Sequence, residues 1–256
     1  MSFAKLEFFN PISRSIKDRT ALGILRPVPR VYEASSGNTA IALAGLSNLM
    51  GLRLRAFLPK NTPAATRLLL ELLGAEVVTT DSEVIDLRLV ERVEKEAQRD
   101  GALHPNQYLN EANFLVHRET GREIAEQLES IGKEPGLLIA GVGTSGHIAG
   151  IGSYLKERYG TRVVGVVPAE GERIPGIKRP LDQRWLEHVD DFVEVTLENA
   201  ISGIREVARL SGILVGLSSG AVYWAMKELS PRETTVLVFP DDVFKYLELI
   251  GTKEKG

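Results

Sequence analysis

The chain has 256 residues, of which 43% are hydrophobic and 25% charged, and its formal net charge is −3. This length suits one large domain or two small ones, and the weak negative charge gives no electrostatic basis for binding nucleic acid or an anionic membrane surface. Disulfides and thiolate catalysis are excluded because the chain has no cysteine, and its four histidines are dispersed without metal-ligand spacing. We therefore expect no metal centre.

The chain contains no long apolar run and no secretory signal. A membrane-spanning helix needs about 20 apolar residues in succession. The first ten residues, MSFAKLEFFN, lack a basic region followed by an apolar one. We expect a cytoplasmic protein with no membrane partner.

Short β-branched runs alternate with amphipathic helical patterns along almost the whole chain. This alternation predicts α/β architecture, with parallel sheets covered by helices on both faces. The expected strands are Ala4–Phe8, Arg30–Glu33, Leu52–Leu58, Glu76–Thr79, Leu137–Val142, Arg162–Val167, Phe192–Val195, Leu214–Gly216 and Thr235–Phe239. The expected helices are Ile16–Leu25, Asn38–Met50, Pro63–Leu73, Ser82–Arg99, Arg118–Glu129, Ile148–Arg158, Leu197–Leu210, Ala221–Leu229 and Val243–Ile250.

A domain boundary is expected near Ala112–His117, where the polar loop HPNQYLNEANF leads into a new helix. It divides the chain into an N-terminal α/β domain, residues 1–115, and a C-terminal α/β domain, residues 116–256. Both lengths suit compact domains. In such folds the functional site lies at the carboxyl ends of strands, so we expect it in the cleft between the two domains.

The segment Gly143–Gly146 follows a buried strand and precedes a helix. Its glycines allow the backbone to approach an anion, and the free N–H groups with the positive helix end favour a phosphate. An ordinary strand-to-helix turn explains the segment equally well. Neither a Walker loop nor a dinucleotide fingerprint is complete here, because no Gly-Lys-Ser/Thr follows and the acid expected about 20 residues on is missing.

Lys17 stands near the start of an expected helix, in the segment NPISRSIKDR. The positive end of a helix and burial both disfavour an ammonium ion, and this is how a lysine becomes nucleophilic. The alternative is a solvated lysine in a Lys-Asp-Arg surface turn.

Two further loops bring hydroxyl groups to the start of a helix. In EASSGNT, Ser35, Ser36, Asn38 and Thr39 supply donors that suit a carboxylate or a second anion. Plain N-capping by Ser36 or Asn38 explains part of this set. The paired serines of LVGLSSGA, residues 214–221, form a similar strand-turn-helix segment, which capping also explains.

These motifs occur in a specific order: NP with SxKDR, then SSGNTAIALA, AGVGTSGHIAG and VGLSSGAVYWA. In this order they resemble the cysteine synthase family of fold-type II pyridoxal 5′-phosphate enzymes, over nearly the whole chain. The resemblance implies two doubly wound, mostly parallel α/β domains of the tryptophan synthase β-like fold, with the active site in the cleft between them. It also implies pyridoxal 5′-phosphate as cofactor, an amino acid and sulfide as small-molecule ligands, and a homodimer.

The resemblance assigns roles to individual residues. Lys17 matches the lysine that holds the cofactor covalently and later moves the Cα proton. Asn38 matches the residue that hydrogen-bonds the cofactor's ring hydroxyl, and Ser218 the serine that faces the pyridine nitrogen. The residues that match the groups binding the amino acid's carboxylate are Ser35, Ser36, Gly37, Thr39 and Gln107. The loop around the cofactor's phosphate is matched by Gly143, Thr144, Ser145, Gly146 and His147.

The implied reaction is β-replacement on an activated serine. Loss of the leaving group gives an α-aminoacrylate, to which sulfide adds to form L-cysteine. A neutral serine opposite the pyridine nitrogen limits carbanion build-up and favours elimination over racemisation or transamination. The alternatives are a serine/threonine dehydratase or a cystathionine β-synthase-type enzyme of the same fold, and a short paralogue without turnover.

The chain departs from the family pattern in three places. IPGIKR, residues 174–179, replaces a glycine-rich stretch, and members acting on O-phosphoserine have a basic residue here. Lys178 and Arg179 would neutralise a phosphate leaving group, which favours O-phosphoserine over O-acetylserine, although a solvated basic turn is the alternative. Ser145 and His147 stand where the family has Gly and Thr. The family also carries a further segment before the first strand, so we expect the start at Met1 to affect stability and dimerisation.

Overall fold

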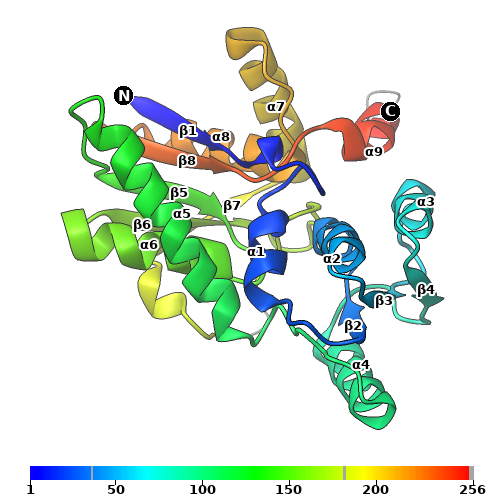
Figure 1. The fold of residues 1–256 in the computed structure, drawn as a ribbon. Helices are drawn as coiled ribbons and strands as arrows, with labels where there is room; N and C mark the ends of the chain where they lie inside the picture. Colours follow the sequence, from blue (N-terminus) through cyan, green and yellow to red (C-terminus); the bar gives the residue numbers. More distant parts are fainter. Residues whose placement is uncertain (36, 181–182, 254–256) are drawn as a thin grey trace. The chain divides into compact units, whose positions relative to one another are not determined.

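A computed structural model describes residues 1–35, 37–180 and 183–253 (Figure 1). The chain divides into two compact units, which we call unit 1 and unit 2. Unit 1 consists of Met1–Phe9 with Phe114–Gly256, and unit 2 of Asn10–Asn113. Both units are α/β, as expected.

The first strand lies in unit 1, not in the expected domain 1–115. The reason is long-range pairing: β1, Ser2–Leu6, runs parallel to β8, Thr235–Phe239, with Ser2 opposite Thr235 and Leu6 opposite Phe239. The second boundary falls between Asn113 and Phe114, inside the first turn of α5, Glu111–Glu129. This helix begins earlier than the expected helix Arg118–Glu129.

Unit 1 is built on a five-stranded parallel sheet with the order β1-β8-β5-β6-β7. Its other strands are β5 Leu137–Gly141, β6 Arg162–Pro168 and β7 Asp191–Val195. Its other long helices are α6 Gly146–Tyr159, α7 Leu197–Ser211 and α8 Leu217–Leu229. Helices α5 and α6 lie on one face of the sheet, and α7 and α8 lie on the other (Figure 1).

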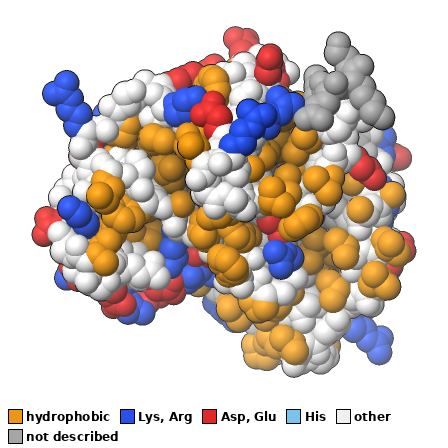
Figure 2. Space-filling model, turned by 90° about the horizontal axis from the view of Figure 1, so that it is seen from above, with side chains coloured by type: hydrophobic (Ala, Val, Ile, Leu, Met, Phe, Trp, Pro, Cys, Tyr) orange, Lys and Arg blue, Asp and Glu red, His pale blue; other side chains and the backbone are white. Residues whose placement is uncertain are grey.

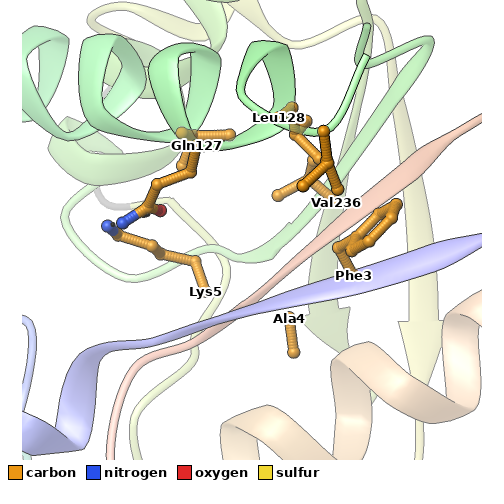
Figure 3. A pocket seen from close by; sticks show the side chains of 8 residues that line it. Phe3, Ala4, Lys5, Gln127, Leu128 and Val236 are labelled. Carbon is orange, nitrogen blue, oxygen red and sulfur yellow. Dashed lines mark hydrogen bonds between the residues drawn. The ribbon is translucent and has the colours of Figure 1, made fainter. Parts of the chain in front are cut away.

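Alternate residues of these strands serve opposite faces, which is why the strands read as continuous apolar runs. Ile139, Leu237 and Phe239 belong to the core cluster that includes α7 and α8. On the opposite face, side chains of β1, β8 and α5 surround a cavity of about 140 Å³ (Figure 3). At its edge the Lys5 ammonium lies 2.9 Å from Glu123 and donates to Gln127 at 3.1 Å. These contacts fasten β1 to α5.

Unit 2 contains a three-stranded parallel sheet with the order β2-β3-β4. Its strands are β2 Arg30–Ala34, β3 Arg53–Leu58 and β4 Glu76–Thr79. Its helices are α1 Lys17–Ile24, α2 Asn38–Leu49, α3 Ala64–Leu72 and α4 Leu87–Asp100. Val31, Leu54 and Leu58 pack in one core cluster with α1 and α2.

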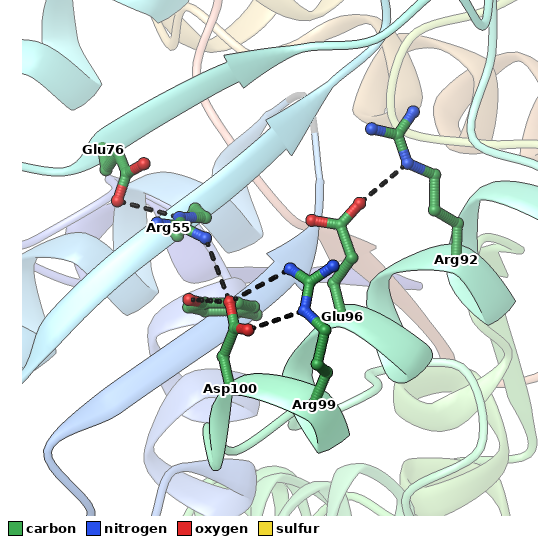
Figure 4. A network of polar contacts seen from close by, with 7 residues as sticks. Arg55, Glu76, Arg92, Glu96, Arg99 and Asp100 are labelled. Atoms are coloured by element: carbon green, nitrogen blue, oxygen red, sulfur yellow. Dashed lines mark hydrogen bonds and ion pairs between the residues drawn. The ribbon is translucent and has the colours of Figure 1, made fainter.

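A polar network joins the strands of unit 2 to α4 (Figure 4). The Nε atom of Arg55 lies 2.8 Å from Glu76, and its guanidinium stacks over the Tyr32 ring at 4.6 Å. The Tyr32 hydroxyl in turn donates to Asp100 at 2.9 Å. Hydrogen bonds from Arg99 and Tyr32 lower the pKa of Asp100, so this carboxylate stays ionised at the end of the helix.

Several further expected elements differ in the structure, among them the helix expected at Ser82–Arg99, which begins only at Leu87. Residues 214–216 form no strand, because Val215 makes a single bridge pair with Asp242 and α8 begins directly at Leu217. The first strand ends at Leu6 and is followed by a 3₁₀ turn, Glu7–Phe9, before the lysine motif. The last expected helix is a 3₁₀ turn, Phe244–Tyr246, that continues into α9, Leu247–Lys253. A further 3₁₀ turn of unit 1, Leu186–His188, precedes β7.

No helix within residues 1–35, 37–180 and 183–253 is both long and apolar enough to cross a membrane. In the same part of the chain, no three His, Cys, Asp or Glu side chains are grouped so as to hold a metal ion.

Helices α7 and α8 cross with their backbones nearly in contact. A Cβ atom at Gly203 would lie 2.1 Å from the carbonyl oxygen of Gly220, and one at Gly220 would lie 2.2 Å from the carbonyl oxygen of Ala200. Backbone atoms cannot move aside as a flexible side chain can. The crossing therefore requires glycine at both positions.

We expect Gly203→Ala to lower the free energy of unfolding by about 2 to 3 kcal/mol, because the added methyl group separates the two helices. Urea-induced unfolding followed by circular dichroism measures this change. Gly251→Ala in α9 is the matched control, since a Cβ there meets no atom within 4 Å. Equal stability of the two variants would contradict the prediction.

Candidate active site

In unit 1, the turn between β5 and α6 leads directly into the N-terminus of a helix. Ser145 immediately precedes α6 and has a left-handed backbone, with φ of 66°, which is strained for a residue other than glycine. Its side chain is buried and makes no capping hydrogen bond to the helix. The first N–H groups of a helix have no intrahelical acceptor, so those at the start of α6 suit an anion.

The loop Ile174–Lys178 lies against this turn. The Lys178 N–H donates to the carbonyl oxygen of Val142 at 2.7 Å. A Cβ at Gly143 would lie 3.4 Å from the carbonyl oxygen of Gly176, which itself has a φ of 91°. The structure therefore brings the basic IPGIKR segment beside the predicted phosphate turn, and the glycines keep the space between them open.

Ser218 lies in the first turn of α8 and is 1% exposed. Among the described residues, its hydroxyl has no hydrogen-bond partner. Its neighbour Ser219 is different, because its hydroxyl is 3.5 Å from the carbonyl oxygen of Asp241. A buried hydroxyl without a partner is costly, so Ser218 is the serine that is ready to bond a ligand atom.

His147, in the first turn of α6, is also buried. Its ring meets the ring of His117 edge-on, with 6.0 Å between centroids, and His117 Nδ1 lies 3.2 Å from the Thr120 hydroxyl. No sequence motif indicates His117. It stands within α5, far from any glycine-rich motif, and the pairing arises only when α5 packs against α6.

In unit 2, α1 begins at Lys17 itself. The buried carboxylate of Asp18 orders the loop before it: Oδ1 accepts from the Ser13 N–H at 2.9 Å and from its hydroxyl at 2.5 Å, and Oδ2 accepts from the Ile12 N–H at 2.8 Å. The Lys17 N–H donates to the Ser15 hydroxyl at 3.1 Å. Asp18 thus fixes where the lysine starts its helix.

The start of α2 is joined to the segment around Gln107. The buried Thr39 hydroxyl donates to the side-chain oxygen of Gln107 at 2.7 Å, and the Ala40 N–H donates to the Ser35 hydroxyl at 3.1 Å. The N-cap residue is Gly37, without a side-chain hydrogen bond, and Asn38 is the first helical residue, so the alternative explanation of Asn38 as an N-cap does not apply. Ser36 lies outside the described residues.

The predicted site residues therefore fall into two groups. Unit 2 brings together Thr39 and Gln107, which are 68 residues apart in sequence, beside Ser35 and Gly37. Unit 1 brings together the phosphate turn, the 174–178 loop and Ser218. Arg179 points elsewhere, because its guanidinium is half-exposed and lies 2.5 Å from Glu194.

Comparison with known proteins covers almost the whole chain. Residues 2–241 match the family described as pyridoxal-phosphate dependent enzyme. The cysteine synthase of Staphylococcus aureus (strain N315) is 32% identical over 272 residues, which cover 96% of this chain and 87% of the relative. The probable cysteine synthase of Bacillus subtilis (strain 168) is 34% identical over 275 residues, covering 96% and 88%. The chain belongs to the cysteine synthase family.

Solved structures agree with this membership. O-ureido-L-serine synthase superimposes with a TM-score of 0.87 at 28% identity, covering 96% of this chain and 85% of that one. The cysteine synthase of Entamoeba histolytica gives 0.84 at 29% identity, covering 96% and 80%. The O-acetylserine-dependent cystathionine β-synthase of Helicobacter pylori gives 0.86 at 28% identity, covering 96% and 88%. The fold is that of a fold-type II enzyme, and the cofactor is pyridoxal 5′-phosphate.

The residues present fit this cofactor. The turn at the start of α6 offers N–H donors for its phosphate, and the unpartnered hydroxyl of Ser218 offers a neutral partner for a ring nitrogen. At Gly176, whose φ is 91°, a Cβ would lie 3.2 Å from the Ser218 hydroxyl, so a residue other than glycine would be strained there.

We expect Asp18→Asn to lower the free energy of unfolding by about 2 to 3 kcal/mol, because the amide nitrogen cannot accept from the buried donors that the carboxylate serves. Thermal unfolding of the purified variant measures the loss. Asp81→Asn, at an exposed position of unit 2, is the control and should unfold like the wild type. A wild-type stability for Asp18→Asn would show that the loop does not depend on this carboxylate.

Proposed function

We propose that this enzyme catalyses β-replacement on an activated serine, with sulfide as the nucleophile and L-cysteine as the product. The observation that carries the proposal is the buried, neutral and unpartnered hydroxyl of Ser218, in a chain that is similar to cysteine synthases over 96% of its length. A neutral hydroxyl at this place supports β-elimination better than reactions that need a strongly electron-withdrawing, protonated ring.

Each half of the site has its own task in this proposal. Pyridoxal 5′-phosphate, when bound, supplies the electron sink for the bonds at Cα. The start of α6 holds its phosphate, Asn38 bonds its ring hydroxyl, and Ser218 bonds its ring nitrogen without a formal charge. Thr144 and His147 are further phosphate donors.

The substrate's carboxylate is received at the start of α2. Thr39 and Gln107, already joined to one another at 2.7 Å, supply hydroxyl and amide groups, and Ser35 and Gly37 supply further polar groups. Lys17 holds the cofactor covalently in the resting enzyme. Once released, its amine accepts the proton of the substrate's Cα and later returns it, as a general base and acid.

We further propose that O-phosphoserine is preferred over O-acetylserine. The Lys178 N–H bond to Val142 joins the start of this basic pair to the turn before α6, and two cations close to that turn would favour a doubly charged leaving group. Arg179 is paired with Glu194 in an exposed ion pair, which a phosphate would compete for. Exposed ion pairs of this kind contribute little to stability, so a phosphate that displaces Glu194 from Arg179 loses little binding free energy.

The expected homodimer is also part of this proposal. Unit 1 exposes several large apolar side chains, namely Leu210, Leu214, Phe244 and Leu247. Figure 2 shows hydrophobic side chains reaching the surface on the face seen there from above. Apolar side chains that gather at a surface are typical of protein contacts, and a second copy of this chain is the proposed partner.

The lysine assignment is tested by absorption. The purified wild type should show the visible band of the covalently held cofactor, and Lys17→Ala should lose the band and all measurable cysteine formation while its circular dichroism stays unchanged. Lys60→Ala, an exposed lysine of unit 2, is the matched control and should keep both. If Lys17→Ala kept the visible band and its turnover, the assignment of Lys17 would be refuted.

Product analysis separates the proposed reaction from its alternatives. A thiol amino acid is the product of the proposed reaction, pyruvate that of a dehydratase, and a thioether that of a cystathionine β-synthase-type enzyme.

The leaving-group preference is tested by Arg179→Ala. We expect kcat/KM to fall about tenfold or more with O-phospho-L-serine, the equivalent of about 1.4 kcal/mol, and less than about threefold with O-acetyl-L-serine. Arg162→Ala removes an arginine that is similarly exposed and paired with Asp191, and it should change neither value. Equal losses with both esters would exclude phosphate recognition by Arg179.

A further inference from the structure

Three titratable side chains of unit 2 form a row that the proposed reaction does not use. His104 Nδ1 lies 2.6 Å from a carboxylate oxygen of Glu94 on α4, and His104 Nε2 lies 3.9 Å from a carboxyl oxygen of Glu33 on β2. The side chains of Glu33 and His104 are each 1% exposed, whereas Glu94 reaches solvent with 42% of its side chain exposed. The row therefore runs from the protein surface to a buried carboxyl group.

The buried end of the row, formed by Glu33 and His104, has polar atoms without hydrogen bonds to other described residues. Within the part of the chain that the structure describes, neither carboxyl oxygen of Glu33 nor Nε2 of His104 has a hydrogen-bond partner. The 3.9 Å between them is about 1 Å longer than a hydrogen bond. Buried polar atoms without partners are costly, so a site that retains three of them is a candidate for a functional role.

The protonation states of Glu33 and His104 determine which of the two groups can donate a hydrogen and which can accept one. Burial raises the pKa of Glu33 to about 8, although the backbone N–H groups of Gln107 and Asn106 lower it in part, so the carboxyl group is mostly protonated at pH 7. Burial likewise lowers the pKa of His104, against the effect of Glu94. The neutral imidazole donates from Nδ1 to Glu94, which leaves Nε2 as an acceptor that faces the protonated carboxyl group 3.9 Å away.

The other charged groups around Glu33 do not neutralise it. From the segment after α4, the buried Tyr108 faces it, and the charge of Glu33 raises the pKa of that phenol further. The arginines of β3 lie opposite Arg30 and Tyr32 in the strand register, one residue out of phase with Glu33 and thus on the other face of the sheet. Helix α2 has no titratable residue. Of the groups named here, only His104 could serve as a counter-ion to an ionised Glu33, and only in its protonated form.

Glu33 and His104 lie close in sequence to the residues that are proposed to bind the substrate's carboxylate. Glu33 is two residues before Ser35, and His104 is three residues before Gln107. The His104 segment is fastened to the edge of β2, because Tyr32 N–H donates to Leu103 at 2.8 Å and Leu103 N–H donates to Arg30 at 2.9 Å. Beyond Glu33 and His104, the two segments meet again at the Thr39–Gln107 hydrogen bond.

We propose that Glu33 and His104 are positioning residues, which hold the segment of residues 104–107 in place so that Gln107 and Thr39 together receive the carboxylate of the amino acid. The inference rests on the proposed function, because it takes these two residues as the carboxylate site. Loss of the Glu33 proton removes the hydroxyl group that faces His104 Nε2 and places a negative charge near the site that receives the substrate's carboxylate. Amino-acid binding therefore weakens as Glu33 ionises.

The test is a titration of the holoenzyme with L-alanine, an amino acid without a leaving group, followed by the cofactor's visible absorption between pH 6 and pH 9.5. Glu33→Gln keeps a neutral donor at every pH, so it should bind L-alanine like the wild type at pH 7 and at least about threefold more tightly than the wild type at pH 9.5. Glu91→Gln, an exposed glutamate of α4, is the matched control and should follow the wild type throughout.

Two further measurements separate positioning from a general structural effect. His104→Phe keeps a ring but removes the acceptor, so it should weaken L-alanine binding about threefold or more already at pH 7. Thermal unfolding of the full chain at several pH values measures how the Glu33 proton affects stability. The folded chain retains the Glu33 proton from pH 4.5 to about 8 whereas the unfolded chain loses it, so wild-type stability should fall through this window and Glu33→Gln should lack that fall.

Two outcomes would overturn the inference and can be told apart. If Glu33→Gln binds L-alanine with the same pH course as the wild type, Glu33 does not position the carboxylate site and the proposed function is untouched. If the wild type shows no absorption change with L-alanine at any pH, the proposed function fails and the inference fails with it.

Discussion

Parallel strand pairing is the constraint on which the rest of this structure depends. Both sheets are entirely parallel, and in unit 1 the strands are covered on both faces, so nearly every strand position is apolar. Polar chemistry is then left to the segments that follow the carboxyl ends of strands. The phosphate turn after β5 and the carboxylate loop after β2 are two such segments, and each leads directly into the N-terminus of a helix, which favours an anion.

Local signals in the sequence were sufficient for those segments. Lys17 at the start of a helix, the turn before α6 and the alternation of strands and helices were all predictable, since each depends on residues close together in the chain. The pairing of β1 with β8 was not, because the apolar pattern of β1 does not specify its neighbour. The start of α5 at Glu111 was hidden by the polar composition of its first turn.

Among the buried polar groups, too, local sequence predicted some features, whereas others depend on long-range packing. The sequence identified Ser218 through its motif, but the absence of a partner for its hydroxyl is a property of packing. Asp18 was read as part of a Lys-Asp-Arg turn, and its role as the acceptor that orders residues 12–15 emerged only from the geometry. Glu33 and His104 lie 71 residues apart, each at the first position of a different polar segment, so no local signal relates them.

The pairing of β1 with β8 has a consequence for how the chain assembles. Unit 2 is one continuous stretch inserted into unit 1, so its sheet can form as soon as residues 10–113 have been synthesised. Unit 1 must wait until β8, near the other end of the chain, has left the ribosome. Until then β1 carries unpaired backbone groups that are open to association with other chains. The N-terminal strand is thus the last part of the sheet to find its place, although it is made first.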